Sequence, residues 1–284
     1  LWAGVTQGHL YPHARRLAVL AGSSWSFDIA ADRLMEFCGI RISDETIRQT
    51  TEAAGARAGE WLRKAESLEK LRNTEGNTEF YTDGTCVNTR TGWREMRVSV
   101  WARRASGEPA EPSEWASRRL PQPGARHITG GLIGSEDPGP RWAGAARLPG
   151  MPDGRGVSVL ADGAKWIWKQ VAEHLSRGGC IVDIYHVSER LHACARALDG
   201  DNTDEARQWA DRRLGALLAS GPAACLRELE QARAQAAEPA RQAAVAGLIA
   251  YMTPGIDGMW YRDRLRRGLP IGSGMVEGAC KTVV

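Results

Sequence analysis

The sequence lacks long apolar runs and any leader-like start. No stretch of about 18 consecutive apolar residues occurs in the 284 residues, which argues against a transmembrane helix. The first residues, LWAGVTQGHLYPHARRL, do not follow the basic-then-apolar pattern of a secretory signal. Hydrophobic content of 43% and charged content of 25% are typical of a globular rather than a disordered chain. We therefore expect a cytoplasmic protein with no membrane partner.

Several common motifs are missing as well. The six cysteines form no CxxC pair, which indicates reduced thiols, and the set Cys180, His186, His192 and Cys194 matches no zinc template. No glycine loop is followed by G-K-[ST], which excludes a phosphate-binding ATPase loop. GSGMVEG follows RGLP rather than a strand, so a dinucleotide site is also excluded.

Lysine is scarce among the basic residues. Only five of the 37 are lysine and the rest are arginine, whose fork pairs well with phosphate oxygens. A GC-rich genome produces the same bias, because it favours arginine, alanine and glycine codons together. Arginine content alone therefore identifies no partner.

Residues 28–64 predict two helices separated by a short turn. The first ends at Gly39, and the second begins after Ser43, a suitable N-cap. This is the outline of a helix-turn-helix DNA reader, with Arg48 and Gln49 near the start of its second helix. A plain helical hairpin has the same outline, and the sequence leaves both interpretations open.

Residues 78–104 predict a β-hairpin. TEFYTDGTCVNT is rich in strand formers, NTRTG suits a turn, and WREMRVSVWARR alternates, with Val98 and Val100 facing the side opposite to Trp101. Asp83 falls in the middle of the first strand. A carboxylate in a strand suited to burial is costly unless it is paired or bound to a metal ion.

After the hairpin, a stretch with little predicted regular structure is followed by two strand–helix units. Residues 105–155 are dense in proline and glycine, so RHITGGL suits a third short strand and the remainder predicts loop with a broken helix. GVSVLAD predicts a strand that ends at Asp162 and is followed by the helix AKWIWKQVAEHL. CIVDIYHV predicts a second buried strand, followed by a helix capped by Ser188. Strand–helix–strand–helix within such a span indicates parallel strands in an α/β sheet.

The last part of the chain is helical. Residues 200 to about 250 carry helical spacing and no strand signal, which predicts an all-helical insertion. GLPIGSGMVEGACKTVV then places Glu277 just inside a final helix.

Asp83, Asp162 and Glu277 lie on three different elements and together suit a two-metal site for Mg²⁺ or Mn²⁺. Separately, each acid suits a turn, a helix cap or a helix first turn. A glycosidase pair of Asp162 and Glu277 would need surface aromatics grouped in loops, which the sequence lacks.

Four segments in this order resemble bacterial insertion-sequence transposases of the Kra type, relatives of the Mutator-like DDE transposases. They are YTDGT with GWREMRVSV, then LADGAKWIW, then IVDIYHVSERL, then LPIGSGMVEGACKTVV, and GSGMVEGACK is the most specific. The resemblance covers roughly residues 78–284. It implies an α/β, RNase H-like core with a mixed sheet and flanking helices, interrupted by an all-α insertion before the last catalytic helix.

The resemblance assigns roles to particular residues. Asp83, Asp162 and Glu277 would form the catalytic, metal-binding triad. Asp183 and His186 would match the acid-x-x-His motif that follows the second aspartate. The expected partners are the DNA of the element's ends and target, and a second copy of the chain on paired ends. The protein would associate with the nucleoid when bound to DNA.

The expected domain organisation follows from the same reading. We expect an N-terminal helical region over 1–77, the first part of the core over 78–199, the insertion over 200–265, and the start of the last core helix over 266–284. Candidate DNA contacts are Arg48, Gln49, Arg94, Arg97, Lys165 and Lys281. Complete family members continue further, so the resemblance implies a truncated copy. The alternative function is a catalytically dead remnant that acts only as a DNA-binding module.

Overall fold

The computed structural model describes residues 10–63, 66–89, 91–132, 138–147 and 154–283. The chain divides into two compact units, residues 1–66 and residues 67–283. The division falls eleven residues before the expected boundary at 77/78. The short helix α4 (Glu66–Asn73) accounts for the difference, because its Leu71 is packed in the core of the second unit.

The first unit consists of three helices. They are α1 (Pro12–Gly22), α2 (Phe27–Cys38) and α3 (Asp44–Arg63). Ala18, Ala30 and Ile47 are fully buried between them. The predicted helix boundaries are confirmed: Gly39 ends α2 in the left-handed region (φ 65°), and the Thr46 N–H donates to Ser43 Oγ at 3.2 Å.

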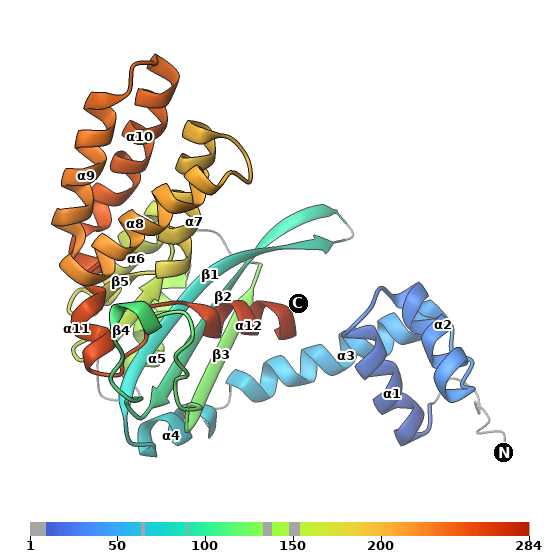
Figure 1. Ribbon diagram of the computed structural model, residues 1–284. Coiled ribbons are helices and arrows are strands. Elements are labelled where there is room, and N and C mark those ends of the chain that lie inside the picture. The colour runs from blue at the N-terminus through green and yellow to red at the C-terminus, as the bar shows by residue number, and fades with distance from the viewer. Residues whose placement is uncertain (1–9, 64–65, 90, 133–137, 148–153, 284) are drawn as a thin grey trace. The chain divides into compact units, whose positions relative to one another are not determined.

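The second unit is built on a five-stranded mixed sheet (Figure 1). Its strands are β1 (Asn77–Thr89), β2 (Gly92–Arg104), β3 (Ala125–Gly131), β4 (Val157–Ala161) and β5 (Gly179–Val182). The order in the sheet is β3-β2-β1-β4-β5. β2 is antiparallel to both of its neighbours, β1 and β3, whereas β4 runs parallel to β1 and β5 runs parallel to β4. The α/β class is thereby confirmed.

The predicted hairpin forms and is buried on both faces at its base. Thr89 pairs with Gly92 at the turn. Gly92 has a φ of 102°, a conformation that favours glycine. Val98 and Val100 enter one core, and Trp101 enters the core on the opposite face. Beyond Tyr81, where pairing with β4 ends, β1 continues with β2 as a ribbon that extends past the other strands in Figure 1.

Helices cover both faces of the sheet. One core packs β-strand side chains such as Phe80 and Val159 against α4, α5 (Pro138–Arg147) and α6 (Lys165–His174). The other core packs Tyr81 and Leu160 against the remaining helices. These are α7 (Ile184–Asp199), α8 (Asp204–Ser220), α9 (Pro222–Gln235), α10 (Pro239–Met252), α11 (Tyr261–Arg266) and α12 (Gly274–Val283), with a 3₁₀ turn η2 (Thr253–Gly258) after α10.

The insertion has the predicted structure, whereas the proline-rich region is more structured than predicted. Between residues 200 and 265 every described element is a helix, as predicted, and α8, α9 and α10 stand together at one end of the sheet (Figure 1). Residues 105–155 hold more structure than predicted: β3 forms where RHITGGL predicted a strand, and α5 is a ten-residue helix. A 3₁₀ turn, η1 (Pro112–Glu114), precedes them.

One predicted strand is wrong beyond Val182. The chain enters α7 at once, with Asp183 rather than Ser188 as its N-cap. Asp183 ends the strand and starts the helix because its N–H still bonds Ala161 O at 2.8 Å while its carboxylate accepts the Tyr185 N–H at 2.8 Å. No helix in the described part of the chain combines the length and the apolar character needed to cross a bilayer.

Candidate metal centre

Asp83 lies where β1 leaves the parallel part of the sheet. Tyr81 pairs with Leu160 of β4 and is the last β1 residue in that ladder. Side chains alternate along a strand, so Asp83 points to the same face as Tyr81, the face covered by α7 and α12. The carboxylate is half-buried, and its Oδ1 accepts the N–H of Gly84 at 2.7 Å.

Asp162 lies beside Asp83 by strand register. It is two residues beyond Leu160, as Asp83 is two residues beyond Tyr81, and parallel neighbouring strands run about 4.8 Å apart. Asp162 follows the last residue of β4 directly, at the carboxyl end of the strand. Its Oδ1 accepts the Ala164 N–H at 2.8 Å, which turns the chain into α6.

Glu277 approaches the two aspartates from a third element. It lies in the first turn of α12, which packs against β1 and β2. Burial raises the pKa of Asp83, and the negative charges of Asp162 and Glu277 raise it further. The Gly84 N–H and the charge of His186 act in the opposite direction. Asp162 and Glu277 therefore both lie within electrostatic range of Asp83.

The buried Asp183 and the half-buried His186 form an acid–imidazole pair next to Asp83 and Asp162. Asp183 is fully buried and accepts hydrogen bonds from the Tyr185 N–H, from the Ser273 hydroxyl and from His186 Nδ1 at 3.1 Å. Burial alone would raise the pKa of Asp183, but the bonds from His186, Ser273 and Tyr185 outweigh it and lower the pKa.

His186 is a resident cation among the acids. The hydrogen bond to Asp183 raises its pKa to about 9 against the effect of burial, and the charges of Asp183, Asp162 and Asp83 add to the rise. The imidazole is therefore protonated at neutral pH. It offsets part of the negative charge that Asp83 and Asp162 bring together.

The turn before α12 is fixed to α7. The Ser273 hydroxyl donates to Asp183, and the Ile184 N–H donates to Ile271 O at 3.0 Å. A Cβ on Gly272 would lie 2.7 Å from the Tyr185 ring, so only glycine fits this approach. The glycine-serine-glycine turn thus couples the buried Asp183 to the helix that carries Glu277.

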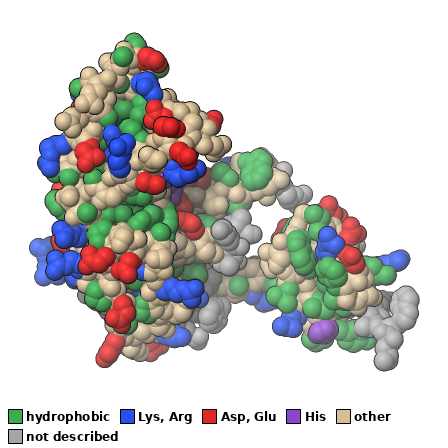
Figure 2. Space-filling view, viewed as in Figure 1, with side chains coloured by type: hydrophobic (Ala, Val, Ile, Leu, Met, Phe, Trp, Pro, Cys, Tyr) green, Lys and Arg blue, Asp and Glu red, His purple; other side chains and the backbone are tan. Residues whose placement is uncertain are grey.

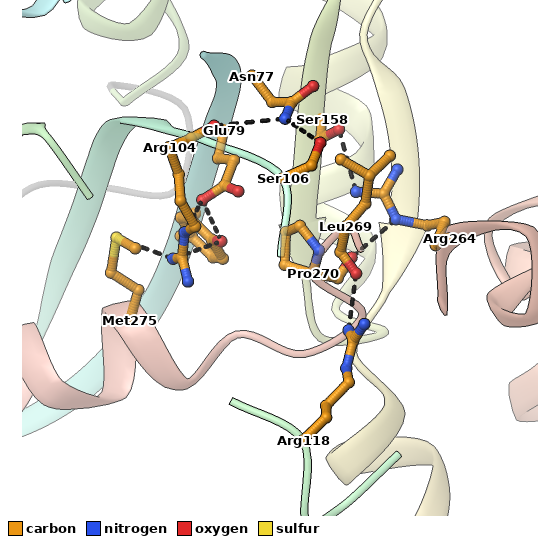
Figure 3. A network of polar contacts seen from close by, with 11 residues as sticks. Asn77, Glu79, Arg104, Ser106, Arg118, Ser158, Arg264, Leu269, Pro270 and Met275 are labelled. Carbon is orange, nitrogen blue, oxygen red and sulfur yellow. Dashed lines mark hydrogen bonds and ion pairs between the residues drawn. The ribbon is translucent and has the colours of Figure 1, made fainter. Parts of the chain in front are cut away.

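A second set of contacts holds the same segment from the other side (Figure 3). Arg118 Nη2 donates to Leu269 O at 2.7 Å, and Arg264 Nε donates to Pro270 O at 2.7 Å. Arg104 Nε donates to the buried Glu79 at 3.1 Å, and Arg104 Nη2 lies 4.0 Å from Met275 Sδ of α12. These contacts set the position of α12 and therefore of Glu277.

Sequence reasoning missed the pair of Glu79 and Arg104. A usable signal existed, because Glu79 pairs with Ala102, so Arg104 is its diagonal neighbour on the same face of the hairpin. The Tyr81 hydroxyl also donates to Glu79, at 2.8 Å. The pair is buried only because helices cover that face of the sheet, and the sequence alone does not show this burial.

The predicted DNA contacts on α3 are occupied within their own helix. Arg48 bonds Glu45 at 2.8 Å and Glu52 at 2.7 Å, and Gln49 donates to Glu45 at 2.7 Å. Two carboxylates therefore surround one guanidinium at this position. Phosphate would have to compete with both of them.

The remaining candidates are placed differently. Arg97 points to the face opposite Asp83, where it is buried 4.0 Å from the centre of the Trp166 ring and is paired with Glu95. Arg94 is exposed on the ribbon and Lys165 is exposed at the start of α6. The side chain of Lys281 lies outside the described residues. On the face shown in Figure 2, basic and acidic side chains are interspersed.

The acids are adjacent, but they do not form a finished ligand cage. Within the described ranges, no three histidine, cysteine, aspartate or glutamate side chains are spaced to hold a metal ion. Asp83 and Asp162 each accept a backbone N–H of their own turn with one oxygen. Each carboxylate retains its second oxygen, and three carboxylates are the donor type that Mg²⁺ and Mn²⁺ prefer.

Comparisons with known proteins assign the chain to no group. No protein-family model matches it, and no curated protein matches it.

Proposed function

We propose that the chain is a DDE-type transposase with an RNase H-like core. Under this proposal Asp83, Asp162 and Glu277 hold divalent cations and promote cleavage and strand transfer of insertion-sequence DNA. The carrying observation is the β1–β4 register, which sets Asp83 beside Asp162 on the face against which α12 packs with Glu277.

The sheet supports the RNase H-like assignment. Three antiparallel strands, β1 to β3, continue into the parallel strands β4 and β5, with helices on both faces. The helices α8 to α11 interrupt the core between α7 and α12, where the resemblance implies an all-α insertion. Carboxyl ends of parallel strands are the usual position of chemistry in α/β folds, and Asp162 lies at such an end.

The chemistry asked of the residues is modest. Bound Mg²⁺ or Mn²⁺ would supply an activated water or 3′-hydroxyl and stabilise the leaving oxygen of a phosphodiester. Asp83, Asp162 and Glu277 would hold and orient the cations from three separate elements. The Asp183–Ser273 contact would keep α12 in register with the sheet. No energy cofactor is required, because each step exchanges a phosphodiester for water or for a comparable bond.

The proposal includes partners and location. The DNA partners are the ends of the element and its target, and the acting species is a homo-oligomer on paired ends. The protein would be cytoplasmic and nucleoid-associated when bound to DNA.

Metal binding tests this proposal directly. Mn²⁺ should bind the full chain, and Asp162→Asn should weaken binding at least about tenfold, because one of three carboxylates is lost. Asp201→Asn is the matched control, since Asp201 is exposed and distant from the triad in the sequence. Calorimetric titration with Mn²⁺ measures both variants. Equal Mn²⁺ affinity in the parent chain and in Asp162→Asn would contradict the metal site.

A second candidate function is a DNA-binding remnant without catalysis. The observation that favours it is the incomplete ligand cage, together with a protonated His186 that already offsets part of the acidic charge. A remnant would bind DNA, but it would not bind Mn²⁺ through Asp162 and would not nick a supercoiled plasmid when Mn²⁺ is present. The transposase proposal requires both Mn²⁺ binding through Asp162 and plasmid nicking.

A further inference from the structure

Two adjoining cavities lie along the first turns of α12. One has a volume of about 260 Å³ and the other of about 410 Å³. They share Arg104, Leu120, Gly274 and Met275 in their walls, so they form one continuous hollow between α12 and the loop before β3. The hollow lies on the same helix as Glu277, and Gly274 precedes Glu277 by about one helical turn.

The hollow is lined by positive charge. Arg104 and Arg118 line the smaller cavity, and Arg104 and Arg126 line the larger one. None of the described residues that line either cavity is acidic. The first turn of α12 also opens on it, and the N-terminal end of a helix carries partial positive charge.

The charges of the buried and half-buried side chains behind this hollow do not balance. Arg104, Arg118 and Arg264 lie in one network with a single carboxylate, Glu79 (Figure 3). Glu79 is already bonded by Arg104 and by the Tyr81 hydroxyl. Arg118 donates one bond to Leu269 O, and its Nη1 has no partner among the described residues. Partial burial lowers the pKa of the Arg118 guanidinium, and a desolvated cation without a counter-charge is costly, so the arrangement favours an anion.

Aromatic rings at the rim indicate what kind of anion fits. Trp115 and Tyr185 line the smaller cavity with their ring centres 5.3 Å apart. Tyr185 is 48% exposed and is the residue directly before His186. Aromatic rings beside arginine are the combination that binds nucleotides, through stacking on the base and pairing with the phosphate.

We propose that this arginine-lined hollow binds a backbone phosphate of the DNA strand whose neighbouring phosphodiester lies at Asp83, Asp162 and Glu277. The site rests on the proposed function and adds the anchor that aligns the strand with the acids. Arg104 and Arg118 supply the charge, the start of α12 supplies backbone donors, and Tyr185 contacts the adjacent nucleotide.

A charge placed at Gly274 tests the site without disturbing the core. A Cβ at Gly274 meets nothing within 4 Å, and the first position of a helix tolerates glutamate well. Gly274→Glu should weaken binding of a short fluorescein-labelled duplex about tenfold or more, through repulsion of the phosphate. Gly274→Gln has the same size without the charge and should bind as the parent does. Fluorescence anisotropy in EDTA measures binding independently of the metal site.

The salt dependence of binding supplies a second readout. Losing one phosphate contact lowers the slope of log K against log salt by about 0.9 for duplex DNA. Arg118→Gln should show this decrease, whereas Arg119→Gln should not, because the exposed Arg119 lines neither cavity. Circular dichroism confirms that each variant is folded.

The outcomes separate this site from the proposed function. If Gly274→Glu and Gly274→Gln bind equally, or Arg118→Gln keeps the parent slope, the phosphate site is wrong. The Mn²⁺ result for Asp162→Asn then still decides the metal site on its own. If inorganic phosphate binds and Gly274→Glu abolishes that binding while leaving duplex affinity unchanged, the ligand is a free anion and the DNA assignment is overturned.

Discussion

The two units of the chain differ in how many carboxylates lie next to their arginines. In the first unit Arg48 is bonded by two carboxylates, Glu45 and Glu52, on the surface of α3. In the second unit Arg104 is paired with one carboxylate, Glu79, while Arg118 and Arg264 donate to the backbone carbonyls of Leu269 and Pro270 beneath a hollow next to Glu277. An arginine already bonded by two carboxylates has few donors left for a phosphate, whereas Arg118, whose Nη1 has no partner among the described residues, keeps a donor available. Under the proposed function we therefore expect DNA phosphate at the start of α12 rather than at Arg48 of α3.

The largest effect should come from removing the carboxylate that is paired with Arg104. Glu79→Gln leaves Arg104 buried without its counter-charge, which typically costs about 3–5 kcal/mol of unfolding free energy. Urea unfolding followed by circular dichroism measures it, with Glu52→Gln on the surface of α3 as the control that should change little. A similar small loss in both variants would mean that the buried cluster is not held together by Glu79.

The Asp183 contacts should give the next largest effect. Asp183→Asn weakens the bonds from the Ser273 hydroxyl and His186, and losing hydrogen bonds to a buried charged group costs about 1.5–3 kcal/mol. A double-mutant cycle with Ser273→Ala isolates the coupling between α7 and the turn before α12. Additive losses in that cycle would show that Asp183 does not hold the turn.

The pH dependence of stability should be smaller and should originate at His186. The folded state holds the His186 proton more tightly than the unfolded chain, with a pKa of about 9 against an ordinary value of 6.5. The resulting stabilisation is complete below pH 6.5 and is lost as the pH rises through about 9. Asp183 acts at the other end: its lowered pKa gives stability above the ordinary value of 3.8 that is lost as the pH falls through its folded value.

Unfolding midpoints measured between pH 6 and pH 10, with the same range for His186→Gln, check this expectation. The variant should lose the part of the decline that the parent shows in this range. Asp162 and Asp83 also face His186, so Asp162→Asn should reduce the effect without removing it. An identical decline in the parent and in His186→Gln would assign it to another group.

The smallest effect is expected at Arg48. Arg48→Ala should leave both the affinity for a labelled duplex and its salt slope close to the parent values, because Glu45 and Glu52 already bond its guanidinium. Anisotropy titrations alongside Arg118→Gln provide the comparison. A decrease in slope of about one at Arg48 and none at Arg118 would reverse the conclusion and restore α3 as the DNA reader.

Much of the fold followed from local pattern. The alternation through Val98, Val100 and Trp101 predicted the hairpin and its two buried faces, and Ser43 and Gly39 marked real helix ends. The strand predicted over residues 180–187 forms as far as Val182 and is wrong beyond it, because the apolar run IVDIYHV is compatible with a buried strand and with a buried helix. What ended it was Asp183, which caps α7 while still bonded to β4.

The sequence by itself determined which residues are the candidate acids: Asp83 within a strand, Asp162 at a strand end and Glu277 after a glycine-rich turn. Tertiary structure alone decided how they meet, because strand register and the packing of α12 join residues about two hundred positions apart. It also decided that Arg48 is satisfied and that Arg118 is not. Charge balance is a property of neighbours in space, and a linear pattern does not contain it.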